Sequence, residues 1–245
     1  MPATGEIRPL PPCRNRRKQQ RWRGCGWKTS NQFGAVRREI ANRVVSERNN
    51  RHHGNMPNRR EEIIVGVAED QDGWRLRLAT FDDIDGLHSL ASIPLVYRYL
   101  FDGAAPDREF IAGRIAQSLT SAADTGVGMW LLGNSSARYA GCVEVRPDLS
   151  ARSAELTYML DPEYWGQGLA VRMSWTAITQ AFPSPQIDSV IAGADLPNTA
   201  SFAVMKRLGM QFRRNVRYPL GCGAEYIIRR NDAGPTPRPA LIRLR

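Results

Sequence analysis

Residues 161–170, with the sequence DPEYWGQGLA, decide how the rest of the chain is interpreted. They follow an apolar, strand-like run at residues 154–160 and precede a helical pattern that extends to about Phe182. Gly166 and Gly168 allow the backbone to turn tightly and to approach a ligand closely. The first N–H groups of the following helix have no acceptor within it, and with the helix dipole they favour an anion such as a phosphate. The stretch therefore predicts a strand-to-helix turn, which is either a plain turn or a phosphate site.

Two widespread phosphate motifs are excluded by the same residues. A P-loop requires Gly-Lys-Ser/Thr, whereas Gly168 is followed by Leu169. A dinucleotide fingerprint has a third glycine and follows a parallel strand, whereas this stretch has only the G-x-G spacing and the strands before it look antiparallel. A phosphate at this turn would therefore belong to another class of ligand.

On both sides of the turn, the hydrophobic pattern alternates between the periods of strands and helices. Helices are predicted between Thr80 and Ala91, from Pro106 to about Leu119, from the turn to Phe182, and at residues 198–208. The order β-α-α-β-β-β-α-β-α-β-β predicts one α/β domain, and no internal repeat is visible. Strands are predicted at residues 74–78, 127–132, 139–145, 154–160, 189–194, 211–218 and 224–230.

Charge divides the 245-residue chain into three parts. Residues 1–60 hold 15 Lys and Arg against 3 Asp and Glu, residues 61–228 hold 14 against 20, and residues 229–245 hold 5 against 1. With the element pattern, this predicts a basic extension at 1–60, a linker at 61–73, a folded domain at 74–230 and a Pro/Arg-rich tail at 231–245. An acidic domain suits a cationic acceptor such as an amine, although an acidic face is usually just solvated surface.

The basic extension at 1–60 is too polar to bury a core of its own, which favours disorder. Its Arg clusters and scattered aromatic residues also suit contacts with phosphates and bases, so weak binding to RNA or to the ribosome is the alternative. An organelle transit peptide is a third interpretation, although the segment is poor in Ser.

Other classes of protein are excluded by composition. No run approaches the roughly 18 apolar residues of a membrane helix, and no apolar segment follows the basic N-terminus as in a secretory signal. We therefore expect a cytoplasmic protein that does not bind membranes. Cys13, Cys25, His52 and His53 have no zinc spacing, so we expect no metal, and Cys142 lies in an apolar run that predicts a buried thiol.

Taken together, these residues resemble the GNAT superfamily of acyl-CoA N-acyltransferases, from about Trp74 to Arg230. The chain is most similar to the branch that contains the ribosomal-protein alanine acetyltransferases. The resemblance implies a mixed, mostly antiparallel twisted sheet with helices on both faces and a splayed central strand pair. It rests on the 161–170 turn with its helix and strand, on Asn198-Thr199-Ala200-Ser201, on Leu208-Gly209-Met210, and on the opening Leu76-Arg77-Leu78-Ala79-Thr80 with Asp82 and Asp83.

The resemblance also implies acetyl-CoA as cosubstrate and a set of donor-binding residues. The family turn reads Gln/Arg-x-x-Gly-x-Gly/Ala, and here Trp165 takes the first position, a variant common in this branch. Backbone amides of the turn would hold the pyrophosphate, and the end of the preceding strand would pair with pantetheine and direct an N–H at the thioester oxygen. Asn198 and Ser201 are equally an N-cap and a first-turn hydroxyl, which is compatible with binding. The donor-binding residues are Met159, Leu160, Trp165, Gly166, Gln167, Gly168, Leu169, Ala170, Asn198 and Ser201.

The family reaction is direct attack of a neutral amine on the acetyl thioester, so the amine must first lose a proton. Glu155, shortly before the strand end, is the candidate base, and an outward-facing strand residue is the alternative interpretation. Glu144 in the adjacent strand is a second candidate. The Tyr that many members use as acid is replaced by Met205, which leaves Tyr158, Tyr218 or solvent to protonate the thiolate.

The implied function is N-acetylation of a primary amine on a protein N-terminus or a small molecule, by a monomer or homodimer. In the family, the acceptor surface comes from segments that correspond to Leu95–Asp107 and Arg217–Glu225. The alternative, from another class, is a non-catalytic acyl-CoA-binding or nucleic-acid-associated module that uses the basic N-terminal arm. Release of CoA in the presence of an amine distinguishes the two.

Overall fold

The computed structural model describes residues 73–232 and 234–244. The basic extension expected at 1–60, and all but the last residue of the linker expected at 61–73, lie outside the described residues. The strands are β1 (Arg75–Leu78), β2 (Met129–Gly133), β3 (Gly141–Asp148), β4 (Ser153–Leu160), β5 (Ser189–Asp195), β6 (Gln211–Tyr218), β7 (Gly221–Arg229) and β8 (Arg243–Leu244). The helices are α2 (Ile84–Ala91), α3 (Pro94–Leu100), α4 (Arg108–Thr125), α5 (Leu169–Ala181) and α6 (Thr199–Arg207), with 3-10 turns η1 (Phe81–Asp83), η2 (Leu149–Ala151) and η3 (Pro162–Tyr164).

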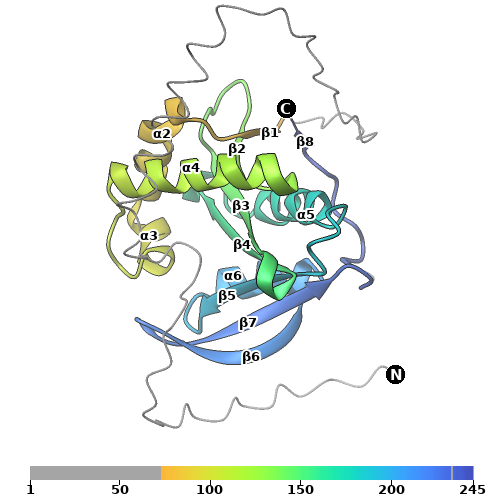
Figure 1. Cartoon of the computed structure of the whole chain (residues 1–245). Helices are drawn as coiled ribbons and strands as arrows, with labels where there is room; N and C mark the ends of the chain where they lie inside the picture. The colour runs from red at the N-terminus through yellow and green to blue at the C-terminus, as the bar shows by residue number, and fades with distance from the viewer. Residues whose placement is uncertain (1–72, 233, 245) are drawn as a thin grey trace, which may run out of the picture.

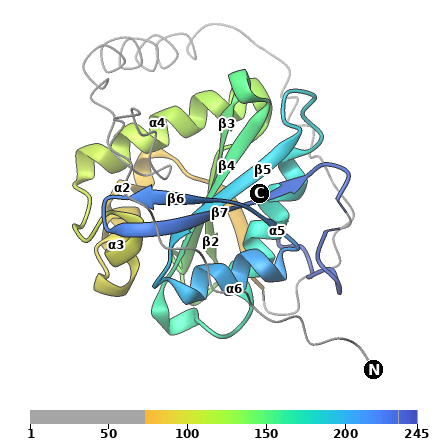
Figure 2. The same ribbon diagram turned by 90° about the horizontal axis from the view of Figure 1, so that it is seen from below.

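The described strands form one twisted sheet in the order β6-β7-β5-β4-β3-β2-β1-β8 (Figure 1). The β4–β5 and β1–β8 pairs are parallel, and the remaining neighbours are antiparallel. The mixed, mostly antiparallel sheet predicted from the sequence is therefore confirmed. In Figure 2, β6 and β7 form a long hairpin that runs past β5 at one side of the sheet.

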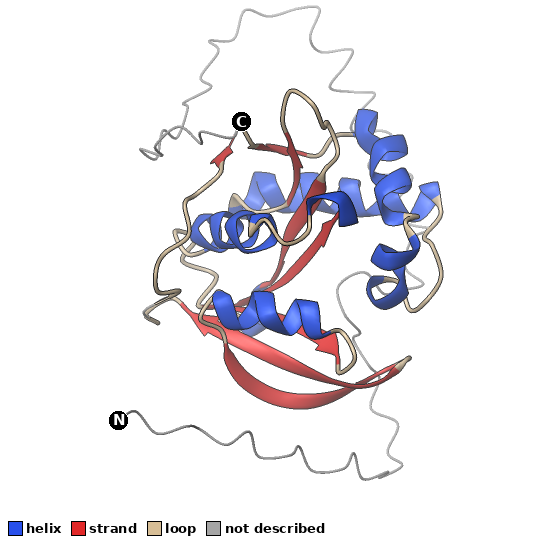
Figure 3. Ribbon diagram, turned by 180° about the vertical axis from the view of Figure 1, so that it is seen from behind, coloured by secondary structure: helices blue, strands red, loops and turns tan. Residues whose placement is uncertain are grey.

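Alternation of side chains along the strands creates two cores, one on each face of the sheet. Along β3, Val143 and Val145 belong to the core that α5 and α6 cover, and Cys142 belongs to the core under α2, α3 and α4. Figure 1 shows α4 across one face, and Figure 3, from behind, shows α5 and α6 across the other. Helices cover both faces of the sheet, as predicted. A ligand can therefore enter the sheet only where two neighbouring strands separate.

Such a separation occurs between β4 and β5. The two strands pair over only three residues of each, Ser153–Glu155 with Ser189–Ile191, although both continue for several residues more. The splayed pair predicted from the sequence is therefore present, closed at the N-terminal ends of the two strands and open at their C-terminal ends.

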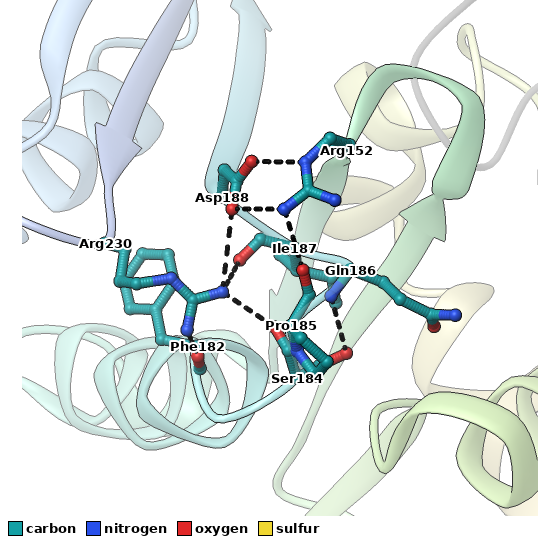
Figure 4. A network of polar contacts seen from close by, with 8 residues as sticks. All are labelled: Arg152, Phe182, Ser184, Pro185, Gln186, Ile187, Asp188 and Arg230. Atoms are coloured by element: carbon teal, nitrogen blue, oxygen red, sulfur yellow. Dashed lines mark hydrogen bonds and ion pairs between the residues drawn. The ribbon is translucent and has the colours of Figure 1, made fainter.

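A polar network holds the closed end together (Figure 4). Arg152, just before β4, donates to the carboxylate of Asp188, just before β5, at 2.6 Å and 3.0 Å. These hydrogen bonds hold the pKa of Asp188 below its ordinary value, so the pair stays charged over the usual pH range. Arg230, just after β7, lies 3.7 Å from the same carboxylate. Its guanidinium also donates to the backbone carbonyls of Phe182, Ser184 and Ile187.

A second, partly buried network around the buried Asp83 carboxylate fixes the start of the α2 region. The Asp83 carboxylate accepts two hydrogen bonds from Arg77 (2.7 and 2.6 Å), one from the Thr80 amide (2.9 Å) and one from the Tyr139 hydroxyl (3.0 Å). Burial raises the pKa of Asp83, but the hydrogen bonds from Arg77 and Thr80 and the charge of Arg77 outweigh it and lower the pKa to about 2. Asp83 therefore joins β1 to the helices that cover one face of the sheet.

Two features differ from the sequence predictions. Pro94–Leu100 forms a separate short helix, α3, between the two helices expected there, with Pro94 in its first turn. The tail expected at 231–245 returns across α5 in its described part and ends in β8, so that Ile242 is fully buried in the core. Within the described residues, no helix has both the length and the apolar character needed to cross a membrane.

Candidate functional site

The turn between β4 and α5 has the geometry that its two glycines predict. Gly166 and Gly168 have φ values of 79° and 75°, in the left-handed region that glycine adopts without strain. The first hydrogen bonds of α5 run from the amides of Val171 and Arg172 to the carbonyl of Gly168, both at 3.1 Å. The amides of the two residues before Val171 therefore have no acceptor inside the helix, and no acidic residue lies in its first turn. This end of α5 suits an anion.

The turn opens onto a cavity of about 570 Å³ that lies where β4 and β5 separate. Its lining includes residues 156–160 of β4 and 192–195 of β5. On one face of the sheet, the lining continues over the start of α5 and along α6, and on the other it includes residues 95, 96 and 98–100 of α3. Because α3 and α6 cover opposite faces, the cavity extends through the gap between β4 and β5 from one face of the sheet to the other.

The edge of β4 that faces β5 presents backbone groups to this cavity. Beyond Glu155, β4 pairs only with β3 on its other side, up to the Gly141–Leu160 pair. The Leu160 carbonyl accepts a hydrogen bond from the Trp165 indole at 2.8 Å, which ties the glycine turn to the strand end. The Tyr158 hydroxyl donates to the Ser201 carbonyl at 3.1 Å and so connects β4 with α6. An extended ligand with amide groups can pair with this edge as a strand does.

The start of α6 forms the wall opposite the glycine turn. The side chain of Asn198 caps the helix by accepting a hydrogen bond from the Ser201 amide at 3.2 Å. Both residues also line the cavity, so the cap and a ligand contact are compatible. Met205, which replaces the tyrosine expected at this point of the family pattern, is fully buried in the core.

Nine of the ten predicted donor-binding residues lie in the lining of the cavity. The exception is Gln167, an exposed residue that is not part of the lining and whose side chain is 3.5 Å from the Glu163 carbonyl. Trp165 is 46% exposed and has its indole at the rim.

The two glutamates considered as bases lie outside the cavity lining. Glu155 is at the closed end of the splayed pair, where its carboxylate forms an ion pair with Arg146 of β3. Glu144 is 2% exposed and forms an ion pair with Arg114 beneath α4. Each carboxylate therefore has an arginine partner in place of a free approach to the cavity.

A carboxylate that the sequence interpretation did not single out lies in the lining. Asp195, the last residue of β5, is 4% exposed. Ala192 and Ala194 belong to the core under α5 and α6, so Gly193 and Asp195 point to the opposite face, the one that α3 covers. The signal in the sequence was a carboxylate directly after the strand predicted at 189–194, at the end where a parallel strand pair opens.

The face of the cavity that α3 covers carries further polar groups. Arg98 and Tyr99 line it, with the Arg98 guanidinium 5.3 Å from the centre of the Tyr99 ring. The Tyr218 ring lies over the sheet here, so that a side chain at Gly193 would place its Cβ 2.1 Å from the Tyr218 hydroxyl oxygen. Burial raises the pKa of Glu225 on β7, but hydrogen bonds from Arg214 and Arg213 bring it below its ordinary value.

Comparison of the sequence with known protein families identifies the class to which this protein belongs. The acetyltransferase (GNAT) domain family matches residues 74–211, more than half of the chain. The chain belongs to this family and is an acetyl-CoA-dependent N-acetyltransferase.

Solved structures of other acetyltransferases share the fold of this chain. A GNAT-family acetyltransferase from Bacillus anthracis has a TM-score of 0.55 at 16% identity, over 68% of this chain and 99% of that one. RimL, a ribosomal-protein α-N-acetyltransferase solved with coenzyme A, has a TM-score of 0.56 at 17% identity, over 66% and 97%. The spermidine N-acetyltransferase from Vibrio cholerae, solved with CoA and spermine, has a TM-score of 0.55 at 15% identity, over 65% and 96%. At these sequence identities, the similarity establishes a shared fold.

Proposed function

We propose that the protein transfers the acetyl group of acetyl-CoA to a primary amine of a protein N-terminus or a small molecule, within the cavity between β4 and β5. The observation that carries this proposal is that one cavity passes through the sheet, with the glycine turn at one mouth and α3 at the other. A donor and an acceptor that enter from opposite faces meet in the middle. That geometry permits direct attack without a covalent intermediate on the enzyme.

Binding of the donor follows from the groups at the first mouth. The amides at residues 166–170 hold the pyrophosphate, because the start of α5 offers N–H groups and a favourable dipole without a competing acid. Pantetheine extends along the unpaired edge of β4, and the Leu160 amide on that edge donates to the thioester oxygen. Asn198 and Ser201 border the same path.

The base is a carboxylate on the face that α3 covers, because the amine arrives from there. We assign this role to Asp195, which lines the cavity on that face. Glu155 remains the alternative that the sequence predicts, and it would act through water and only after release from Arg146. A lysine amine, with a pKa of about 10.4, needs the base more than an α-amine, with a pKa of about 7.7–8.0.

In the transfer, the nitrogen lone pair forms the C–N bond, the C–S bond breaks with its electrons on sulfur, and the amine proton passes to the base. The thiolate then leaves on the donor side, so its proton must be supplied there. Tyr158 lies on that face, packs against the core under α5 and α6, and lines the cavity. Tyr218 covers Gly193 on the opposite face. We therefore assign Tyr158 as the proton donor to the thiolate, for which its hydroxyl must turn from the Ser201 carbonyl towards the sulfur.

The charges at the acceptor mouth favour an acceptor with a single positive charge. Among the residues that line the cavity, Asp195 is the one carboxylate, and Arg98 stands at the α3 side. A polyamine or an aminoglycoside would bring several positive charges against Arg98, with one carboxylate to balance them. A peptide with a free N-terminus brings one charge, which it loses on reaction.

The experiment measures CoA release with a panel of a free N-terminal peptide, the same peptide with a blocked N-terminus, spermidine and an aminoglycoside. The free peptide should react and the blocked peptide should not. With the reactive acceptor, Asp195→Asn should keep the Kd for acetyl-CoA and lower kcat by about 10²–10⁴-fold, a loss that shrinks as the pH rises and the amine becomes neutral. Glu155→Gln serves as the matched control and should keep kcat within a few-fold.

Three outcomes would contradict parts of this assignment. Wild-type kcat in Asp195→Asn with a large loss in Glu155→Gln would return the role of base to Glu155. Reaction of spermidine in preference to the peptide would overturn the argument from Arg98. Tight binding of acetyl-CoA without CoA release for any amine would identify a non-catalytic acyl-CoA-binding module instead.

A further inference from the structure

The C-terminal segment after β7 crosses the α5 side of the fold and reaches the opposite edge of the sheet (Figures 1 and 3). We call residues 234–244 the strap. Its backbone is held along α5 by a hydrogen bond of 2.9 Å from the Ile242 amide to the Thr176 hydroxyl. The Arg172 side chain donates to the Ala240 carbonyl at 3.4 Å. The strap ends in β8, which pairs with β1.

The first residues of the strap pack tightly against α5 and against the residues that follow α6, which fixes their position. An added Cβ at Gly209, two residues after the end of α6, would lie 2.9 Å from the carbonyl carbon of Gly234. An added Cβ at Gly234 would lie 2.8 Å from the Trp175 ring of α5. Pro235 is buried. The residues that follow, up to Pro239, are therefore held beside the end of α6.

Between the strap and α6 lies a groove of about 530 Å³. Three of its lining residues carry positive charge, Lys206 and Arg207 from α6 and Arg238 from the strap, and none of its lining residues carries a negative charge. Lys206 and Arg207 alone have an ordinary explanation, since cations in the last turn of a helix balance its dipole. Arg238 comes from a segment far away in the sequence and adds a third charge that this explanation does not cover.

The groove adjoins the donor mouth of the cavity. Val171, in the first turn of α5, and Arg207 line both spaces. A ligand that places its pyrophosphate on the start of α5 therefore has this groove directly beside it. In CoA, the next anionic group beyond the pyrophosphate is the 3′-phosphate of the ribose, which carries a charge of roughly −1.5 to −2 near pH 7, as phosphate monoesters do.

We propose that this groove binds the 3′-phosphate of CoA, with Lys206 and Arg207 supplied by the domain and Arg238 by the strap. The strap thereby completes the donor site with a segment that lies after the match to the family, which ends at residue 211. This inference rests on the proposed donor site at the start of α5. It explains why a Pro-rich segment positions one of its side chains beside α6: the rigid backbone holds Arg238 at a low entropic cost.

The test compares the Kd of the full-length protein for CoA and for 3′-dephospho-CoA by titration calorimetry. Wild type should bind CoA about tenfold more tightly, as expected for several charge-assisted contacts to one phosphate. Arg238→Gln should weaken CoA by several-fold and leave 3′-dephospho-CoA unchanged, so that the ratio of the two constants falls. Added salt should reduce the wild-type ratio, because the charges are exposed.

Arg138→Gln is the matched control. It removes an arginine whose side chain is 70% exposed and which lines neither space, so both dissociation constants should stay as in wild type. The melting temperature of Arg238→Gln should also match wild type, since the contacts that hold the strap do not involve this side chain.

The possible results distinguish the groove, the strap and the donor site at the start of α5. Equal binding of CoA and 3′-dephospho-CoA by wild type would overturn the inference and leave the donor site intact. A wild-type ratio that is unchanged in Arg238→Gln would overturn the contribution of the strap. Failure of both ligands to bind would overturn the proposed donor site, and the inference with it.

Discussion

The substitution Gly168→Ala tests whether the glycine turn holds a phosphate, because no protein atom occupies the place of the added methyl group. An added Cβ at Gly168 meets nothing within 4 Å, and the strain comes from its φ of +75°. Placing an L-residue in this left-handed conformation costs roughly 1–2 kcal/mol. For a domain of this size, Gly168→Ala should therefore lower the melting temperature by about 2–8 °C, since each kcal/mol corresponds to about 2–4 °C.

Gly126 provides a control with the same local geometry at a different place in the fold. It follows the C-terminus of α4 with φ of +76°, and an added Cβ there also meets nothing within 4 Å. Gly126→Ala should cost the same stability as Gly168→Ala. Gly126 does not line the cavity, so its replacement should leave the affinity for acetyl-CoA unchanged.

The two variants should separate when acetyl-CoA is titrated. At Gly168 the methyl group occupies the space beside the amides that we propose hold the pyrophosphate, and the affinity should fall at least tenfold, or about 1.4 kcal/mol. The assay is titration calorimetry on both variants and wild type, with the melting temperature of each measured without ligand. Equal affinities in all three proteins would refute the placement of the pyrophosphate. A much larger loss of stability at Gly168 than at Gly126 would refute the strain argument.

Two further predictions concern stability. The pKa of Asp83 in the folded protein is about 2, below its unfolded value, so the charged carboxylate stabilises the fold by roughly 2 kcal/mol above pH 4, and this stabilisation is lost as the pH falls from about 4 to about 2. Denaturant titrations of wild type and Asp83→Asn should therefore give unfolding free energies that differ by that amount at pH 7 and converge near pH 2. A difference that stays constant with pH would contradict the lowered pKa. Ile242→Ala should lower the free energy of unfolding by about 2–5 kcal/mol, because Ile242 is fully buried in the core. The control Leu149→Ala, at a residue that is 47% exposed, should change it by less than about 0.5 kcal/mol. Equal effects of the two substitutions would show that the strap is not part of the core.

Most of the sheet could be predicted from the sequence, because local periodicity determines which residues face a core. The run at 154–160 and the glycine turn after it correspond to β4 and the start of α5. The helix α3 was missed because a segment of seven residues after a proline is too short to show a helical period. The strand β8 was missed because two residues that pair with a distant edge carry no local signal.

The parts of the candidate site that could be predicted are those that lie in short local motifs. Of the predicted donor-binding residues, Met159, Leu160 and residues 165–170 lie in one stretch around the glycine turn, and Asn198 and Ser201 lie in a second. Each group could therefore be predicted from its local sequence. The pairing of Glu155 with Arg146 depends on the register between β3 and β4, which a single sequence does not reveal. The place of Asp195 in the cavity depends on where β5 separates from β4, and Arg238 lies beside α6 only because the strap turns back across α5.

The most direct test of the central claim is amide hydrogen exchange of the full-length protein with and without saturating acetyl-CoA. Binding between β4 and β5 should slow the exchange of the amides at 166–170 and of those on the free edge of β4 at 156–160, because these groups then donate to the ligand. Helix α4, which does not line the cavity, should keep its exchange rates. Protection at these two segments is the predicted result, and unchanged exchange there at millimolar acetyl-CoA would contradict the account.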